Sequence, residues 1–444
     1  MISQEVDLLV LGGIVLTADH NWNTYDPGVV AVDGGAIVGV GPRHEVEGAY
    51  RGRERIDAGG KLIMPGLLNA HTHAPMTLFR GIADDLPLET WLYKYIWPAE
   101  TKLLSPDFVR LGTQLAAAEM IRSGTVLFCD MYYFEDDIAE ACKEAGIRVV
   151  IGEALVDFPT ANCQTPEDQL KYTEYLLSQW NDDPLVVPSV QPHSPYAASS
   201  ELMQQSKELA DEYGAPYLLH VSETQSEVRE SIEKYRRTPV GRLADLGLLG
   251  PTTVAIHGVH LTDEDIELLA QYETGVVHCP ESQLKLASGF TPVPKLLEAG
   301  VKVGLGTDGA ASNNDLDMFG EMGTAAKVHK VIAGDPTTMP ARQALSMATL
   351  EAARVLGLDD RLGSLEVGKR GDIIVLDLDV PHMVPVYNIT SHLVYAAHSS
   401  DVRTVIIDGR VVMRDRELLT LDEGEIFARA REMAHEIVAS WGSN

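Results

Sequence analysis

The chain has 444 residues, of which 45% are hydrophobic and 23% are charged, the balance of an ordinary globular protein with a large core. Its 65 acidic and 35 basic residues give a formal net charge of −30, which argues against a nucleic-acid partner because such a partner needs a basic face. The longest apolar run near the start, Leu8–Leu16, contains two glycines, is too short to cross a bilayer and follows no basic segment, so we expect neither a membrane span nor a secretory signal.

Four cysteines are scattered along the chain and form no C-x-x-C pair. They are Cys129, Cys142, Cys163 and Cys279. This usage is typical of reduced thiols in or near the core of a cytoplasmic protein.

Both ends of the chain have the pattern of β-strands. Short β-rich runs flank Asp33-Gly34-Gly35 near the start and Asp408-Gly409 near the end, and Asp-Gly between such runs is a strong hairpin signal. We therefore predict one small β-sandwich domain, formed by residues 1–60 and 369–444 together, with a terminal helix over Glu423–Trp441.

Residues 61–368 alternate short apolar runs with longer amphipathic stretches. The predicted strands are Leu62–Asn69, Thr125–Asp130, Ile147–Ala154, Leu185–Gln191, Pro216–Val221, Thr253–His257, Gly275–Cys279 and Val301–Thr307. The predicted helices between them include Pro106–Arg122, Pro166–Gln179, Ser199–Tyr213 and Asp263–Tyr272. This alternation favours a parallel (β/α)₈ barrel of the TIM type, and an open doubly wound sheet is the competing fold. No G-x-G-x-x-G follows the first strand, which counts against a dinucleotide site.

Several of the 14 histidines stand where a predicted strand ends. His71 and His73 follow the first strand, His220 ends the fifth, and Asp308 ends the eighth. The carboxyl ends of barrel strands form one mouth, and residues i and i+2 of an extended segment point to the same side. These four side chains therefore predict an N₃O site for one Zn²⁺, with Fe²⁺ as the alternative metal and with room for an activated water.

Each of these residues also has an ordinary structural explanation. A single His-x-His pair is more often a surface or hydrogen-bonded core feature, and Asp308 followed by Gly309 is common turn chemistry. The prediction of a metal site therefore depends on finding potential ligands at the ends of several predicted strands, and not on any one residue. No lysine ends the fourth strand, so one metal ion is favoured over a lysine-bridged pair.

Two further residues lie beside this predicted metal site. Glu223 stands three residues after His220 and can carry protons into the mouth or be a solvated residue at a helix start, and the spacing does not decide between them. Either His257 or His260 can face the ion, and the strand register favours His257. No G-x-S-x-G motif and no phosphate-binding glycine loop supports another chemistry.

These motifs together resemble the amidohydrolase superfamily over nearly the whole chain. The matching segments are Pro65-Gly66-Leu67-Leu68-Asn69-Ala70-His71-Thr72-His73, His220-Val221-Ser222-Glu223-Thr224, His257-Gly258-Val259-His260 and Gly306-Thr307-Asp308-Gly309. More closely, the chain is similar to the S-adenosylhomocysteine/5′-methylthioadenosine deaminases. The segments that carry this likeness are Gly81-Ile82-Ala83-Asp84-Asp85-Leu86-Pro87-Leu88 with Trp91, Trp97-Pro98-Ala99-Glu100, Pro192-His193-Ser194-Pro195-Tyr196 and Thr307-Asp308-Gly309-Ala310-Ala311-Ser312-Asn313-Asn314.

The resemblance implies a role for each matching residue in hydrolytic deamination at C6 of adenine by zinc-activated hydroxide. The implied zinc ligands are His71, His73, His220 and Asp308. Glu223 would give a proton to N1 of the ring, while His257 and Asp308 would take the proton of the attacking water and help ammonia leave.

The resemblance also implies contacts with the nucleoside. Glu100 would accept hydrogen bonds from the ribose hydroxyls, His193 would contact the substrate further out, and Trp91 would line the pocket, with Glu223 and Asp308 reaching the base. Without the resemblance, Trp91 is best interpreted as a packing aromatic and Glu100 as a surface acid.

The chain departs from the family pattern at two places. Members that accept the homocysteine adduct often have arginines after the third strand, whereas this chain reads Gly152-Glu153-Ala154 and has no arginine between Arg148 and Arg229. Because a glutamate would repel a carboxylate, we expect a neutral 5′ substituent. The second departure is Pro280-Glu281-Ser282-Gln283, where the family usually has a smaller residue and an Asn, so contacts after the seventh strand are open.

The leading interpretation is a zinc-dependent deaminase that converts 5′-methylthioadenosine, S-adenosylhomocysteine, 5′-deoxyadenosine or adenosine to the inosine analogue and ammonia. A deaminase or chlorohydrolase of triazines or other aminoheterocycles is the alternative, and a non-catalytic metal-binding barrel is a third. We expect a cytoplasmic homo-oligomer that acts on a small nucleoside and binds neither nucleic acid nor membrane.

Overall fold

The computed structural model describes residues 3–86 and 88–441 and builds the middle of the chain from two parallel four-stranded sheets. One sheet has the order β12-β10-β9-β8, with β8 at Leu67–Thr72, β9 at Thr125–Asp130, β10 at Arg148–Ile151 and β12 at Val186–Pro188. The other has the order β14-β15-β16-β17, with β14 at Tyr217–Val221, β15 at Thr253–His257, β16 at Gly275–His278 and β17 at Val303–Leu305. Neighbouring strands in both sheets are parallel, so their carboxyl ends point the same way.

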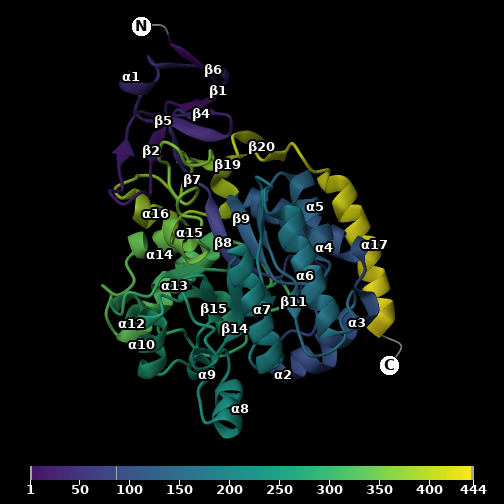
Figure 1. Cartoon of the computed structure of the whole chain (residues 1–444). Helices are drawn as coiled ribbons and strands as arrows, with labels where there is room; N and C mark the ends of the chain where they lie inside the picture. The colour runs from purple at the N-terminus through teal and green to yellow at the C-terminus, as the bar shows by residue number, and fades with distance from the viewer. Residues whose placement is uncertain (1–2, 87, 442–444) are drawn as a thin grey trace.

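Helices follow these strands and surround them (Figure 1). They include α4 (Pro106–Arg122), α5 (Glu135–Ala145), α6 (Pro166–Trp180), α7 (Ser200–Tyr213), α8 (Gln225–Tyr235), α10 (Asp263–Gln271) and α13 (Met318–Ala333). Their starts follow the capping chemistry of the sequence: Ser105 accepts a hydrogen bond from the backbone N–H of Phe108, and Thr262 forms a capping box with Asp265. The predicted helices therefore begin within one residue of the observed ones.

Hydrogen bonds also connect the two parallel sheets at their outer strands. The backbone N–H of Asp308, after β17, donates to the carbonyl of His71 in β8 over 3.0 Å. On the other side, Val190 donates to Pro216 over 2.9 Å and accepts from Leu218 over 3.0 Å. The predicted mixed α/β class is confirmed. Closure of the two sheets into one eight-stranded barrel stays a prediction.

Strands from both ends of the chain share a second region. A seven-stranded sheet has the order β21-β20-β19-β18-β7-β2-β3, in which β7 (Lys61–Pro65) pairs with β18 (Ile373–Asp377) and with β2 (Ile14–Leu16). Its other strands are β3 (Thr24–Tyr25), β19 (Val402–Ile407), β20 (Arg410–Arg414) and β21 (Glu417–Leu418). A four-stranded sheet lies beside it at the N-terminal end and has the order β5 (Ala36–Pro42), β4 (Gly28–Asp33), β1 (Gln4–Leu11) and β6 (Tyr50–Asp57) (Figure 1). Leu8, Ile63 and other buried apolar residues from both sheets form one cluster. The limits of this domain stay a prediction, although β7 lies just past residue 60.

Both predicted hairpins are present. Gly34 and Gly35 have φ angles of +55° and +75° in the turn between β4 (Gly28–Asp33) and β5 (Ala36–Pro42), as a type I′ turn requires. Asp408 and Gly409 also have positive φ in the turn between β19 and β20.

The predicted strand Leu62–Asn69 is wrong in one respect, because it consists of the two strands β7 and β8. The chain changes partner at Gly66, from β18 in the terminal sheet to β9 in the parallel sheet. A Cβ at Gly66 would lie 2.2 Å from Cγ1 of Val126, so the crossing needs a glycine.

The predicted terminal helix and the buried cysteines are both present. The helix α17 (Glu423–Trp441) is present and lies along α4, where Glu423 pairs with Arg122 (Figure 1). All four cysteines are buried and free. In residues 3–86 and 88–441, no helix combines the length and the apolar character needed to cross a membrane.

Candidate active site

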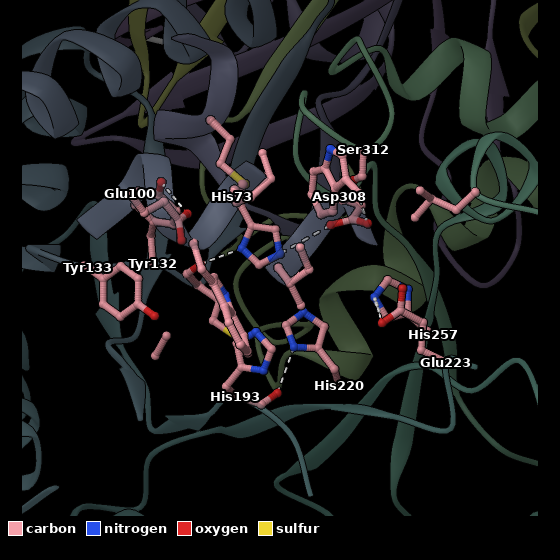
Figure 2. A pocket seen from close by; sticks show the side chains of 18 of the residues that line it. His73, Glu100, Tyr132, Tyr133, His193, His220, Glu223, His257, Asp308 and Ser312 are labelled. Carbon is pink, nitrogen blue, oxygen red and sulfur yellow. Dashed lines mark hydrogen bonds and ion pairs between the residues drawn. The ribbon is translucent and has the colours of Figure 1, made fainter. Parts of the chain in front are cut away.

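The predicted site residues lie together at the carboxyl ends of the parallel strands (Figure 2). Eight of them line one pocket: His73, Trp91, Glu100, His193, His220, Glu223, His257 and Asp308. His71 is completely buried beside them. The structure therefore brings every predicted site residue into one region, although they come from segments up to 237 positions apart (308 − 71).

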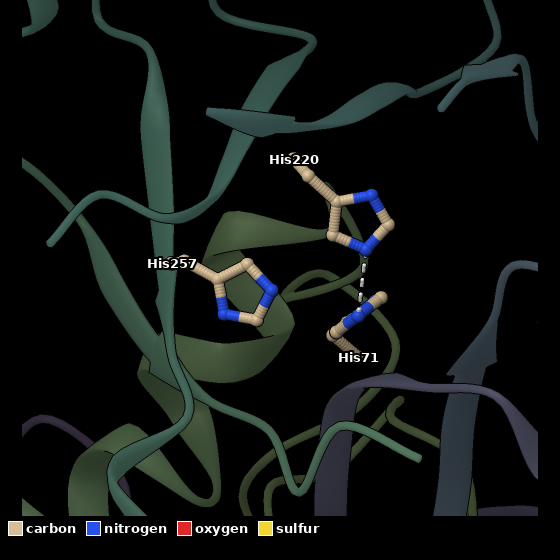
Figure 3. Close-up of side chains that lie close together, drawn as sticks. All are labelled: His71, His220 and His257. Carbon is tan, nitrogen blue, oxygen red and sulfur yellow. Dashed lines mark hydrogen bonds between the residues drawn. The ribbon is translucent and has the colours of Figure 1, made fainter. Parts of the chain in front are cut away.

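The predicted metal ligands fall into two close groups that share His71: His71, His73 and Asp308 form one, and His71, His220 and His257 form the other. Nε2 of His71 lies 3.2 Å from Nε2 of His220 and 3.6 Å from Oδ1 of Asp308, and Nε2 of His73 lies 3.3 Å from the same oxygen. Donors about 2.0–2.1 Å from a tetrahedral zinc ion are themselves about 3.3 Å apart, so these separations fit. His257 faces His71 and His220 from the side (Figure 3) and forms a second close group with them.

Hydrogen bonds on the far side of two imidazoles fix their orientation. Nδ1 of His73 lies 2.5 Å from the carbonyl oxygen of Met131, and Nδ1 of His220 lies 2.7 Å from that of His193. These bonds place a proton on Nδ1 and leave Nε2 of each ring as the atom that faces the site. Burial lowers the pKa of His73, but Asp308 raises it to about 9, so a metal ion would displace a proton from Nε2 of this ring. Burial also lowers the pKa of His71 to about 3, so its ring is neutral at neutral pH. The donor set therefore fits a divalent zinc ion.

Asp308 is held by two serine hydroxyls that the sequence reasoning missed. Ser282 and Ser312 donate to Oδ2 of Asp308 over 2.6 and 2.9 Å, which leaves Oδ1 facing His71 and His73. Burial alone would raise the pKa of Asp308, but the neighbouring imidazoles of His71 and His73 hold this pKa well below its ordinary value. Both serines lie in segments that were compared with the family pattern, Pro280–Gln283 and Thr307–Asn314. Only their contact with Asp308 in the structure indicates what they do.

Glu223 and His257 form a second pair beside the metal donors. Oε2 of Glu223 lies 3.9 Å from Nε2 of His257, and both side chains are nearly buried. Burial, assisted by the charge of Asp308, raises the pKa of Glu223 to about 8, so this carboxyl group can carry a proton at neutral pH. His260 does not line the pocket, and its Nε2 bonds to the carbonyl of Ser288, so the register argument for His257 is confirmed.

Trp91 and Glu100 reach the pocket from the helices that follow the first strand. Trp91 ends α2 (Leu88–Trp91), and Glu100 lies in α3 (Trp97–Leu103). The hydroxyl of Tyr132 donates to Oε1 of Glu100 over 2.7 Å, and burial raises the pKa of Glu100 to about 7. Glu100 is therefore no surface acid. Tyr132 was missed, although it stands two residues after the predicted strand Thr125–Asp130, where the strand-end argument could have found it.

The lining of the pocket, among the residues that the structure describes, contains no lysine and no arginine. Arg148 is not available, because its guanidinium is buried and bonds to Asp372 and Asp408 outside the pocket. Glu153 is also fully buried and does not line the pocket, and burial raises its pKa to about 8. The expected repulsion of a substrate carboxylate by Glu153 is therefore wrong, since this residue is neutral and points elsewhere.

The model of the amidohydrolase family matches residues 62–412, and the chain belongs to this family. A protein of Syntrophobacter fumaroxidans named 5-methylthioadenosine/S-adenosylhomocysteine deaminase is 52% identical over 98% of this chain and 100% of its own length. A protein of Methanosarcina acetivorans named 5′-deoxyadenosine deaminase is 44% identical, over 98% of this chain and 99% of its own. The crystal structure of an adenosine deaminase from Xanthomonas campestris with bound zinc has a TM-score of 0.97 at 41% identity, covering 99% of this chain and 100% of that one.

Proposed function

We propose that this protein is a zinc-dependent hydrolase that deaminates adenine nucleosides at C6, giving the inosine analogue and ammonia. The observation that carries the proposal is the meeting, in one pocket, of a zinc-type donor set, the Glu223–His257 pair and the Glu100 carboxyl group. Relatives named for four different adenine nucleosides, which match this chain nearly from end to end, support the same chemistry.

One zinc ion would be held by the three imidazoles and the carboxylate that face each other at the strand ends, with Fe²⁺ as the alternative. Its ligands would be His71, His73, His220 and Asp308. When bound, zinc supplies the Lewis acidity that makes water a nucleophile at neutral pH.

The chain's own residues would move the protons. Glu223, protonated at neutral pH, gives its proton to N1 of the adenine, so that the ring can accept electrons as water adds to C6. His257 has its pKa lowered to about 4 by burial and is neutral, so it can take a proton from the attacking water, with Asp308 beside it. His257 and Asp308 then give a proton to the amino group as it leaves C6 as ammonia.

The other end of the pocket would hold the ribose. Tyr132 occupies one oxygen of Glu100 and leaves the other free to accept from a ribose hydroxyl, while Trp91 and His193 line the space around the nucleoside. An aminotriazine has no ribose hydroxyls, and its N–H donors lie directly on the ring, so this contact favours a nucleoside over an aminotriazine.

We also propose that the preferred nucleoside has a neutral 5′ substituent, as in 5′-methylthioadenosine, 5′-deoxyadenosine or adenosine. The support is the lack of a lysine or arginine in the described lining of the pocket and the engagement of Arg148 with Asp372. An amino-acid carboxylate placed there would lose its hydration without gaining a cationic partner.

A substrate panel on the zinc-quantified protein tests these proposals. Ammonia release is measured with adenosine, 5′-deoxyadenosine, 5′-methylthioadenosine, S-adenosylhomocysteine and an aminotriazine, before and after removal of the metal by a chelator. We expect turnover of the nucleosides, its loss with the metal and its return with Zn²⁺. Turnover of the triazine alone would favour the alternative enzyme, bound zinc without any turnover would favour a binding protein, and a clear preference for S-adenosylhomocysteine would contradict the neutral substituent.

The architecture around the site is part of the proposal. The backbone hydrogen bonds from Asp308 to His71 and from Val190 to Pro216 support closure of the two parallel sheets into one (β/α)₈ barrel. The barrel would span residues 61–368, except for β7, which pairs in the sheet of the chain termini, and it would carry the two-ended β-sandwich on its side. A cytoplasmic location and assembly into a homo-oligomer stay predictions.

A further inference from the structure

Glu227, which has no part in the chemistry above, binds the backbone that carries Glu223. It lies in the first turn of α8, and its side chain is nearly buried. Its Oε1 accepts from the backbone N–H of Ser222 over 2.9 Å, and its Oε2 accepts from the backbone N–H of Glu223 over 2.8 Å. Both carboxylate oxygens are therefore used on the short turn between β14 and α8.

This turn has a conformation that needs external support. Ser222 has a φ of +54°, in the left-handed region that costs a non-glycine residue about 1 kcal/mol or more. The carbonyl of Ser222 accepts from the backbone N–H of His260 over 2.9 Å. Glu227 on one side and the segment after β15 on the other thus hold the peptide groups around Ser222 and Glu223.

Ordinary helix capping does not account for this arrangement. At the start of α10, the third helical residue, Asp265, returns a bond to the N–H of its own N-cap residue, Thr262. Glu227 is likewise the third residue of its helix and donates its N–H to the N-cap residue Thr224. Its carboxylate, however, reaches past Thr224 to the two preceding N–H groups.

We infer that Glu227 is a positioning residue that fixes the place of the Glu223 carboxyl group beside His257. The inference rests on the proposed function, because it gives Glu227 an effect only through the proton that Glu223 delivers. Displacement of a reacting group by about 1 Å can cost about 100-fold in rate. The two hydrogen bonds that Glu227 accepts hold the backbone N–H groups of Ser222 and Glu223 in place, and with them the start of the Glu223 side chain.

The central test is the near-isosteric substitution Glu227→Gln. One amide oxygen can still accept, but the amide NH₂ then faces a backbone N–H, so one of the two bonds is lost. We expect kcat for the best adenine nucleoside to fall by about 10–100-fold, with KM and zinc content nearly unchanged. Glu233→Gln, on the exposed side of the same helix, is the matched control and should behave as the wild type. Glu227→Asp, which keeps the carboxyl group but shortens its reach, should lose activity as Glu227→Gln does.

Two readouts separate positioning from a general structural effect. In a Glu223→Gln background, adding Glu227→Gln should change the residual rate less than twofold, because the group that Glu227 positions is already gone. Amide hydrogen exchange should accelerate at Ser222 and Glu223 in Glu227→Gln, while the strands keep their protection.

The outcomes have distinct meanings. An equal loss of rate in both backgrounds, or an active Glu227→Gln enzyme with unchanged kcat, would overturn the inference and leave the proposed function standing. A zinc-loaded wild type inactive on every adenine nucleoside would overturn the proposed function and this inference with it.

Discussion

The hydroxyl of Tyr132 donates a 2.7 Å hydrogen bond to Oε1 of Glu100, and both side chains are buried in the pocket that contains the metal donors. Tyr132 follows β9, whereas Glu100 comes from α3, so the bond connects two separate strand-end segments. It lowers the pKa of a carboxyl group that burial would raise further, and it leaves a single oxygen for the substrate. In the proposed function, the pair would present a directed acceptor to a ribose hydroxyl.

Removal of this hydroxyl should weaken ribose recognition selectively. We expect Tyr132→Phe to raise KM for 5′-deoxyadenosine about tenfold, the effect of losing roughly 1.4 kcal/mol from a buried hydrogen bond. Turnover of 2′,3′-dideoxyadenosine, which has no hydroxyl for Glu100, should change little. Steady-state kinetics on the two substrates measures the difference, and an equal loss for both would show that Tyr132 acts only through packing.

The serine hydroxyls on Asp308 should control metal affinity. Ser282→Ala removes one of the two donors to Oδ2, and the loss of such a partner of a metal ligand typically costs about 10–100-fold in affinity. We expect weaker zinc binding in competition with a chromophoric chelator and activity that excess Zn²⁺ restores. Ser288→Ala is the control, because the hydrogen bonds given for Ser288 in the described structure are made by its backbone, with His260 and Gln283. Unchanged zinc affinity in Ser282→Ala would contradict the role of this bond.

The sequence predicted those parts of the site that follow from periodicity. His71, His220, His257 and Asp308 could be placed together because parallel strands end at one edge. The hydrogen-bond partners of these residues could not be predicted. Ser282 lies in α11 (Pro280–Lys285) and Asp308 follows β17, and no pattern of residue types in the sequence indicates that the two side chains meet.

The same limit applies to the fold. Hydropathy located the apolar segment Leu62–Asn69, but not its division at Gly66, because the division comes from a change of neighbouring strand. Likewise, the sequence placed Glu153 near the site, and only the structure shows that its side chain is buried away from the pocket.

Glu153 should make the stability of the protein depend on pH. Burial raises its pKa from 4.5 to about 8 in the folded protein. Between these values the folded state binds more protons than the unfolded state, so the free energy of unfolding falls as pH rises. Glu153→Gln cannot ionise, and its melting temperature relative to the wild type should therefore rise from pH 5 to about pH 8 and then level off. Thermal melts across this range measure the gap, with the exposed Glu167→Gln as control. A gap independent of pH would show that Glu153 is ionised in the folded protein.

Arg148 should stabilise the fold and have no contact with substrate. Its guanidinium bonds twice to Asp372, over 2.5 and 3.2 Å, and also to Asp408, so it ties β10 to the sheet of the chain termini. Removal of one partner of a buried ion pair typically costs about 3–5 kcal/mol, because the other charge stays buried alone. We expect Arg148→Met to lower the melting temperature strongly, and Arg148→Met with Asp372→Leu to recover part of the loss.

The kinetic behaviour of Arg148→Met bears on substrate choice. At a temperature where the variant is folded, KM should be unchanged for both 5′-methylthioadenosine and S-adenosylhomocysteine, since Arg148 does not line the pocket. A selective rise in KM for S-adenosylhomocysteine with an unchanged melting temperature would contradict this, because it would mean that the guanidinium leaves Asp372 to pair with the substrate carboxylate. The melting and kinetic measurements together thus decide whether Arg148, the first residue of β10, stabilises the fold or binds the substrate.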